Sequence, residues 1–84
     1  MEIACILIEK SCVDENWQAQ GKDLYLRCSI QDYYIKFCES KVKKEDIVSR
    51  IDSAVTAEVE IVKGVWDDCV LEREGYYVRL LKIN

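Results

Sequence analysis

Alternation between hydrophobic and polar residues recurs along most of the chain and predicts strands. Residues 3–9 form an almost unbroken apolar run, which is typical of a strand buried on both faces. Residues 24–30, 33–38 and 54–62 alternate residue by residue, and so does the last run, residues 76–83. The pattern therefore predicts five strands.

The same alternation assigns side chains to the two faces of these strands. Leu24 and Leu26 point to one face while Tyr25 and Arg27 point to the other. We expect the core face to hold Leu24, Leu26, Cys28, Ile30, Tyr33, Ile35, Phe37, Val55, Ala57, Val59 and Ile61. The opposite face would then present Tyr25, Arg27, Tyr34, Lys36 and Cys38 to solvent or to a ligand.

Polar residues and glycines predict the connections between the strands. Residues 10–22 are polar and read as a long loop, and Gln31-Asp32 reads as a two-residue hairpin turn. Gly64 interrupts an alternating run and suggests a bulge or a bend. A strand candidate at residues 69–73 leads to a turn predicted at Glu74-Gly75.

One segment changes its period and predicts a helix. Over residues 43–52, Ile47, Val48 and Ile51 share one side at helical spacing, and Ser40 is a candidate N-cap. The lysines at the start of this segment oppose the helix dipole. We expect an amphipathic helix of about three turns.

The predicted order is strand, strand, strand, helix, strand, strand. One helix cannot cover both faces of a flat sheet, whereas a sheet that curls on itself hides its apolar face and its edges. We therefore expect a single domain over residues 1–84, mainly β, folded as a small five-stranded OB-like barrel with one helix between strands 3 and 4. A small α+β sheet and an SH3-like barrel remain alternatives.

Composition excludes several classes of function without pointing to a single one. The chain has 84 residues, no histidine and five cysteines, with no C-x-x-C pair. Imidazole chemistry is excluded, no nucleophile–base pair can be nominated, and a zinc site would need four converging thiolates. We expect a non-enzymatic protein without cofactor or metal, and reduced cysteines in a cytoplasmic setting, with Cys5 and Cys28 packing as small hydrophobes.

The chain shows no signal for a membrane. No run approaches the roughly 18 apolar residues that a membrane helix needs. The start carries Glu2 where a secretory signal would carry a basic residue. We expect no membrane association.

The C-terminal third carries a pattern that resembles a known group. Gly64-Val65-Trp66-Asp67-Asp68-Cys69, followed by Arg73-Glu74-Gly75-Tyr76-Tyr77-Val78, is similar to the G-x-W-D…R-x-G-x-Y-V pattern of small uncharacterised bacterial OB-fold-like proteins. The resemblance covers about residues 55–83. It implies the OB-like fold and a bacterial source, and it brings no assigned activity and no catalytic residues.

An OB barrel binds ligands across its second and third strands, flanked by the first and last inter-strand loops. The residues expected there form the candidate ligand or partner surface: Trp17, Tyr25, Arg27, Tyr34, Lys36, Trp66 and Arg73. Aromatic and basic side chains together suit single-stranded nucleic acid. A net charge of −4 disfavours phosphate binding, so nucleic acid is the alternative ligand, beside a small molecule.

The last strand has apolar residues on both faces, although one small barrel has only one core. The excess side chains, Tyr77, Leu81 and Ile83, form a candidate oligomer face that the helix or a second copy of the chain would cover. We therefore expect an interaction module that binds a protein partner, with a second copy of itself among the candidates.

Overall fold

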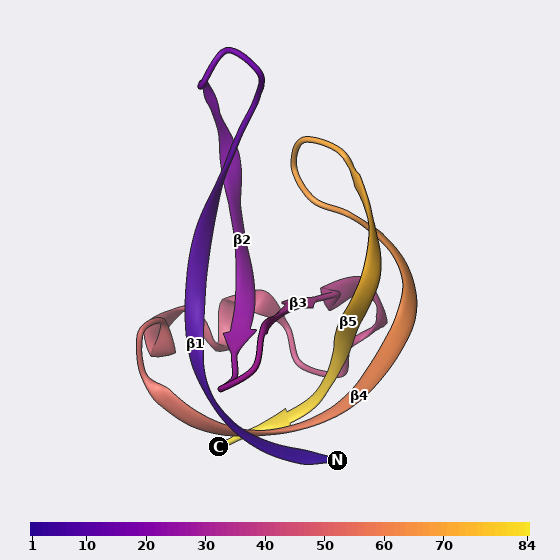
Figure 1. The fold of residues 1–84 in the computed structure, drawn as a ribbon. Coiled ribbons are helices and arrows are strands. Elements are labelled where there is room, and N and C mark those ends of the chain that lie inside the picture. Colours follow the sequence, from indigo (N-terminus) through magenta and orange to yellow (C-terminus); the bar gives the residue numbers. More distant parts are fainter.

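The computed structural model describes all 84 residues, and most of them lie in strands. The strands are β1 (Glu2–Val13), β2 (Ala19–Arg27), β3 (Asp32–Ile35), β4 (Ala54–Asp67) and β5 (Glu72–Ile83). Three short 3-10 turns, η1 (Phe37–Glu39), η2 (Lys44–Asp46) and η3 (Val48–Arg50), lie between β3 and β4 (Figure 1). The prediction of a mainly β chain with five strands is confirmed.

The strands form one sheet that closes in a ring, in the order β1-β2-β3-β5-β4 and back to β1. All neighbours are antiparallel except β3 and β5, which run parallel with Tyr34 opposite Tyr77. Strand β1 takes part in two pairings, because residues 2–6 lie against β4 and residues 6–13 lie against β2. Closure therefore pairs the two strands that would otherwise form the edges of the sheet.

The core fills the inside of the ring, where the alternating positions of the strands meet. Leu26, Ala57 and Leu80 have no exposed surface, and Tyr33 and Val55 are also buried. Burying one such aliphatic side chain stabilises the fold by about 1.5–3 kcal/mol. The core cluster consists of Cys5, Leu7, Leu24, Leu26, Tyr33, Ile35, Ile47, Val55, Ala57, Val59, Val78 and Leu80. The predicted core face is confirmed at most positions, although Ile30 is 82% exposed.

The predicted helix over residues 43–52 is wrong, as is the α+β alternative that needed one. The segment forms the 3-10 turns η2 and η3, with Ile47 N–H donating to the Lys44 carbonyl at 3.1 Å. Ile47 separates the turns with φ −124° and is fully buried, whereas Val48 is 45% exposed. One apolar side chain, Ile47, thus holds the segment to the core. A single buried side chain does not require a continuous helical face.

Ser40 does not cap a helix. Its hydroxyl donates to the Lys36 carbonyl at 2.8 Å, and its oxygen accepts from Leu80 N–H at 2.8 Å. The Lys41 N–H donates to the Leu80 carbonyl, so the chain leaving β3 stays hydrogen-bonded to β5. The serine thus supports the parallel side of the ring, where backbone pairing is short.

Two predicted connections are misplaced. The loop expected over residues 10–22 is a hairpin, because β1 continues to Val13 and β2 begins at Ala19. The turn expected at Glu74-Gly75 lies inside β5, and the chain reverses instead over residues 68–71. Backbone pairing extends both hairpins through residues with no apolar alternation, so hydropathy alone does not mark these strands.

Two smaller turn predictions also shift. The reversal between β2 and β3 lies at residues 28–31, where Cys28 N–H donates to the Gln31 carbonyl at 3.0 Å, and Asp32 already belongs to β3. Strand β4 runs straight through Gly64, and its register shift falls between Glu58 and Val59 instead. The glycine serves packing, as described below.

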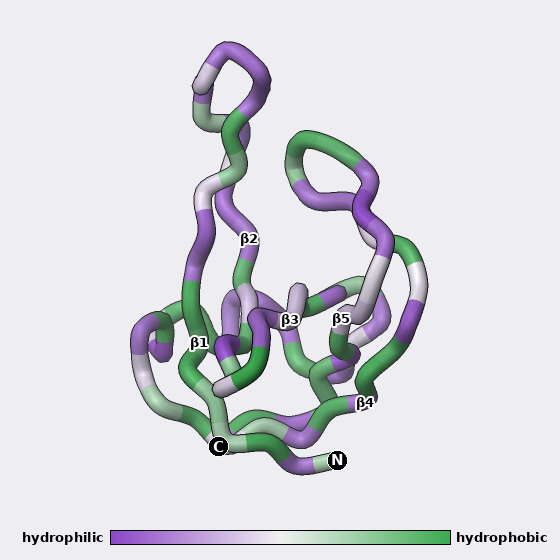
Figure 2. The backbone as a smooth tube through the Cα atoms, in the orientation of Figure 1, coloured by the Kyte–Doolittle hydropathy of each residue, from purple (hydrophilic) through white to green (hydrophobic).

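The hairpins β1–β2 and β4–β5 extend beyond the ring on the same side, away from both termini (Figure 1). The hairpin β1–β2 is capped by residues 14–18, where Asp14 accepts N–H bonds from Asn16 and Gln18 and holds Trp17 at φ 62°. Figure 2 shows polar residues on much of this hairpin, whereas the turn between β4 and β5 is mostly hydrophobic. The two hairpins form the walls of the cleft described next.

Candidate functional site

A cleft of about 400 Å³ lies between the two hairpins. One wall comes from the upper part of β1 and from β2, and the other from the ends of β4 and β5 and the turn between them. Its lining residues are Lys10, Ser11, Cys12, Val13, Tyr25, Trp66, Asp68, Val70 and Arg73.

A row of four aromatic rings forms one side of this cleft and continues beneath it. Tyr25 meets Tyr34 edge-on at 5.7 Å between ring centroids, and Tyr34 stacks on Trp66 at 5.6 Å. Trp66 in turn meets Tyr77 edge-on at 6.1 Å. Pairs in these geometries stabilise a structure by about 0.5–1.5 kcal/mol beyond burial. The row links β2, β3, β4 and β5 and gives the cleft a rigid aromatic floor.

The pairing register of the strands places these rings next to one another. Tyr25 lies opposite Tyr34 across β2 and β3, and Tyr34 lies opposite Tyr77 across β3 and β5. The Tyr34 hydroxyl donates to the Asp67 carbonyl at 3.2 Å, which ties β3 to the end of β4. The indole nitrogen of Trp66 is buried and has no hydrogen-bond partner.

Gly64 makes room for this arrangement. A Cβ atom there would lie 3.3 Å from a ring carbon of Tyr77, and the ring is held by neighbours on its other sides. On the next strand, the Trp66 ring lies over Gly75, which has a φ of 151°. The two glycines are register partners across β4 and β5, so both rings pack against a backbone without side chains.

The basic side chains around the cleft are already engaged. Asp32 accepts two hydrogen bonds from Arg27, at 2.9 and 3.1 Å, and its carboxylate also lies 2.7 Å from the Lys10 ammonium. These hydrogen bonds, Arg27 first and Lys10 second, lower the pKa of Asp32 to about 2. On the other wall, Arg73 donates to Asp68 at 2.9 Å. These carboxylates neutralise the cations that would otherwise attract phosphate.

A second cluster of charges lies at Glu39 in η1. Lys36 contacts its carboxylate at 2.9 Å, and Arg79 and the Tyr77 hydroxyl donate to it at 2.8 and 2.9 Å. Lys36, then Arg79 and then Tyr77 lower the pKa of Glu39 to about 2. The Lys36 ammonium also lies 4.8 Å from the centre of the Tyr77 ring. The cluster fixes the lower end of the aromatic row.

Exposed apolar side chains lie on both hairpins, and two of them, Val13 and Val70, line the cleft. Val13 and Trp17 belong to the hairpin β1–β2, with exposed fractions of 42% and 84%. Val65, Val70 and Leu71 belong to the hairpin β4–β5, with exposed fractions of 45%, 37% and 48%. Apolar residues that gather on a surface in this way are typical of interaction sites.

A disulfide between Cys12 and Cys69 joins the two walls, with 6.0 Å between the Cα atoms. The expectation that all cysteines are reduced is therefore wrong for this pair, and their sequence separation of 57 offered no signal. Cys5 is buried as expected, and burial raises the pKa of its thiol to about 11. Cys28 packs half-buried against the core, while Cys38 is exposed.

The predicted ligand surface is partly assembled. Tyr25, Trp66 and Arg73 line the cleft, and Tyr34 stacks beneath Trp66. Three further residues lie outside the lining: Lys36 donates to the Val65 carbonyl beside the row, Arg27 is paired with Asp32, and Trp17 projects from the hairpin tip.

The predicted oligomer face does not lie open. Tyr77 is 4% exposed and is covered by Trp66 and Lys36, so its side chain belongs to the aromatic row. Leu81 and Ile83 are half-buried, and Ile83 packs against the core. The excess apolar residues of the last strand are thus covered largely within the chain.

Sequence reasoning missed several cleft residues. Lys10, Cys12 and Val13 were assigned to a loop, and the carboxylate partners Asp32 and Asp68 were assigned to turns. The residues Lys10 to Val13 do not alternate in hydropathy, so nothing in their pattern signalled a longer strand.

A second cavity of about 380 Å³ lies at the other end of the molecule, near the N-terminus. Its lining is almost entirely apolar and includes Met1, Ile30 and Tyr33. It lacks the two-walled shape and the aromatic row of the first cleft, and it provides a reference site for binding experiments.

No known protein family, no curated protein and no solved structure matches this chain. None of its helical segments has the length and hydrophobicity that crossing a bilayer requires.

Proposed function

We propose that this chain is a non-catalytic, OB-like interaction module that binds an extended segment of a protein partner in the cleft between its hairpins. The observation that carries the proposal is the placement of exposed apolar side chains on both walls, on either side of an aromatic row. Binding would bury Val13 from one hairpin and Val70 from the other.

The strand order supports the OB-like description. The ring runs β1-β2-β3-β5-β4 and includes a parallel β3–β5 pair. OB-folds bind ligands on the face of strands 2 and 3, between the loops that follow strands 1 and 4. The cleft occupies the corresponding place, and 3-10 turns take the position of the usual helix.

Electrostatics favour a protein segment over nucleic acid. A phosphate backbone would have to displace Asp32 from Lys10 and Arg27, and Asp68 from Arg73. The net charge of −4 opposes its approach as well. A peptide places no such demand, because its side chains can pack on the apolar residues Val13 and Val70 of the two walls.

The same contacts support a binding role without catalysis. The charged groups that line the cleft, Lys10, Asp68 and Arg73, are each held in an ion pair. A general acid or base needs a pKa near the working pH, whereas the pKa of Asp68 is lowered, because the effect of burial is outweighed by hydrogen bonds from the Leu71 N–H and from Arg73. We also propose a cytoplasmic location, in line with the three free cysteines, in which the Cys12–Cys69 disulfide would be open to reduction.

The test uses a library of random linear peptides selected on the immobilised full chain. We expect selected peptides to be rich in apolar and aromatic residues and to shift the NMR signals of Tyr25, Trp66 and Val70. The Val70→Asp variant should weaken binding at least tenfold, because it places a charge on the apolar wall of the cleft. The matched control is Ile30→Asp, which alters an exposed apolar residue at the second cavity.

Three outcomes would overturn the proposal. Peptides could fail to be selected, they could lose affinity with Ile30→Asp instead, or a thymidine oligonucleotide could quench Trp fluorescence with a strong salt dependence. The last result would support the nucleic-acid alternative. If the partner is a second copy, sedimentation should show an association that Val70→Asp abolishes and Ile30→Asp preserves.

A further inference from the structure

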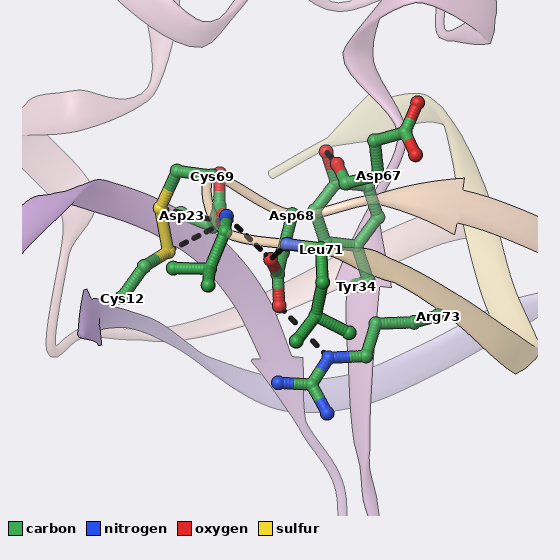
Figure 3. A network of polar contacts seen from close by, with 9 residues as sticks. Cys12, Asp23, Tyr34, Asp67, Asp68, Cys69, Leu71 and Arg73 are labelled. Carbon is green, nitrogen blue, oxygen red and sulfur yellow. Dashed lines mark hydrogen bonds and ion pairs between the residues drawn. A yellow bond between two sulfur atoms is a disulfide. The ribbon is translucent and has the colours of Figure 1, made fainter. Parts of the chain in front are cut away.

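The disulfide of the cleft has a carboxylate against it. Asp23 Oδ2 lies 3.1 Å from the Cys12 sulfur and 3.6 Å from the Cys69 sulfur (Figure 3). The three residues come from β1, β2 and the turn between β4 and β5, and their ligand atoms lie within 4.8 Å of one another. Two sulfurs and one carboxylate oxygen thus converge from three separate segments.

The carboxylate of Asp23 has no cation of its own. It is partly buried and takes part in none of the ion pairs of the chain. Asp68 adds a further negative charge beside it, while the Lys44 ammonium donates to the Lys22 carbonyl instead. The Cys69 backbone and the more distant Lys44 charge favour this carboxylate, but neither forms an ion pair with it, and a bound cation would relieve the cost of burying its charge.

We propose that the reduced Cys12 and Cys69 thiolates, together with Asp23, bind a zinc ion. A zinc ion prefers four tetrahedral ligands, with Zn–S near 2.3 Å and Zn–O near 2.0 Å, which separates a sulfur from an oxygen by about 3.5 Å. The two sulfur–oxygen distances are already close to that spacing. Only the sulfurs must move apart, through side-chain rotation, and water completes the shell.

Reduction of the disulfide and the binding of zinc account for every electron and proton. A dithiol reductant supplies two electrons and two protons, the S–S bond breaks, and two thiols form while the reductant becomes a disulfide. Zinc then replaces the two thiol protons, which pass to solvent. The hairpins are therefore joined by a covalent bond in the oxidised chain and by a metal ion in the reduced chain. This inference does not depend on the identity of any cleft partner.

Cobalt(II) is the spectroscopic probe. The full chain, reduced with a phosphine under argon, should bind one equivalent of Co²⁺ with a sulfur-to-metal charge-transfer band and the visible bands of a tetrahedral ion. Zinc added afterwards should displace the cobalt. The oxidised chain is the matched control, because it retains Cys5, Cys28 and Cys38 but has no thiol at the site. It should show no such bands.

Two variants assign the ligands. Asp23→Asn should weaken zinc binding by about tenfold or more, whereas Asp46→Asn, an exposed acid in η2, should not. Cys69→Ser should abolish the charge-transfer band, with the fold checked by circular dichroism. Absence of cobalt binding by the reduced chain, equal binding by the oxidised chain, or unchanged affinity in Asp23→Asn overturns the proposal.

Discussion

Gly64 shows how one missing side chain shapes the cleft. The Tyr77 ring lies against its backbone, and the ring is held from other sides by Trp66, Lys36 and Glu39. A larger residue at position 64 has no room unless this ring moves. The packing of the Tyr77 ring therefore gives a reason for glycine at this position.

We expect Gly64→Ala to destabilise the protein by about 1–3 kcal/mol, because the added methyl group overpacks the Tyr77 ring. Urea unfolding followed by Trp fluorescence measures the loss. The neighbouring Lys63→Ala, an exposed position on the same strand, is the control and should change stability little. Equal stability of Gly64→Ala and the wild type would contradict this account of the glycine.

Glu39 predicts a dependence of stability on pH. Its pKa falls from 4.5 in the unfolded chain to about 2 in the fold, mainly through Lys36 and then Arg79 and Tyr77. A lowered pKa means that the folded state binds fewer protons, so its contribution is present above pH 4.5 and is lost as the pH falls towards 2. Asp32, with a pKa also near 2, acts in the same direction.

We expect Glu39→Gln to lose less stability than the wild type when the pH falls from about 6 to about 2.5, since the variant has no carboxylate to protonate there. Denaturant midpoints at the two pH values measure the difference. Glu58→Gln, an exposed acid on β4, serves as the control and should follow the wild type. A Glu39→Gln profile that matches the wild type would exclude the proposed role of this cluster.

At the scale of elements, the segment between β3 and β4 buries an apolar side chain without forming a helix. Ile47 is fully buried, whereas the adjacent Val48 is 45% exposed. An amphipathic helix would have buried both on one face. Two substitutions at neighbouring positions therefore distinguish the observed 3-10 turns from the expected helix.

We expect Ile47→Ala to cost about 2–5 kcal/mol of unfolding free energy, because it leaves a cavity in the core. Val48→Ala should cost less than about 0.5 kcal/mol, as is usual for a surface position. Chemical denaturation of both variants under one set of conditions gives the comparison. Similar losses for the two variants would favour a helix in solution.

The elements that sequence reasoning recovered are those where one face is buried. Leu24 and Leu26 in β2, and Val55, Ala57 and Val59 in β4, alternate because their polar neighbours face outward. The same logic identified Tyr25 and Tyr34 on the opposite face, which became the aromatic row.

The alternation of apolar and polar residues did not reveal the strands where a hairpin extends beyond the core. Residues 10–13 and 63–67 are paired by backbone hydrogen bonds but have little buried surface, so hydropathy does not mark them as strands. Gly75 looked like a turn residue because glycine favours turns, yet its positive φ occurs inside β5. The ion pairs of Asp32 and Asp68 depend on this three-dimensional placement and could not be read from spacing.

At the scale of the whole molecule, the Cys12–Cys69 disulfide joins segments that are 57 residues apart. A cross-link over a loop of that length restricts the unfolded chain and stabilises the fold by about 4 kcal/mol on a chain-entropy basis. The link spans the cleft rather than the ring, so the core strands do not depend on it for their pairing.

We therefore expect reduction to lower the free energy of unfolding by about 2–4 kcal/mol while the ring stays folded. Urea titrations with and without a phosphine reductant, in the presence of a chelator, measure the change. The Cys12→Ser/Cys69→Ser double variant is the control and should not respond to the reductant. Loss of all structure on reduction would show that the ring needs the cross-link.

Because the molecule consists of a ring and two projecting hairpins, part of its sequence can change without affecting the core. None of the twelve core side chains lies in residues 14–18 or 68–71, the two tips that reach past the cleft. Substitutions at the tips consequently leave the interior intact. The tips could be exchanged for other short sequences, in the laboratory or in evolution, and the same ring would then present a different binding surface.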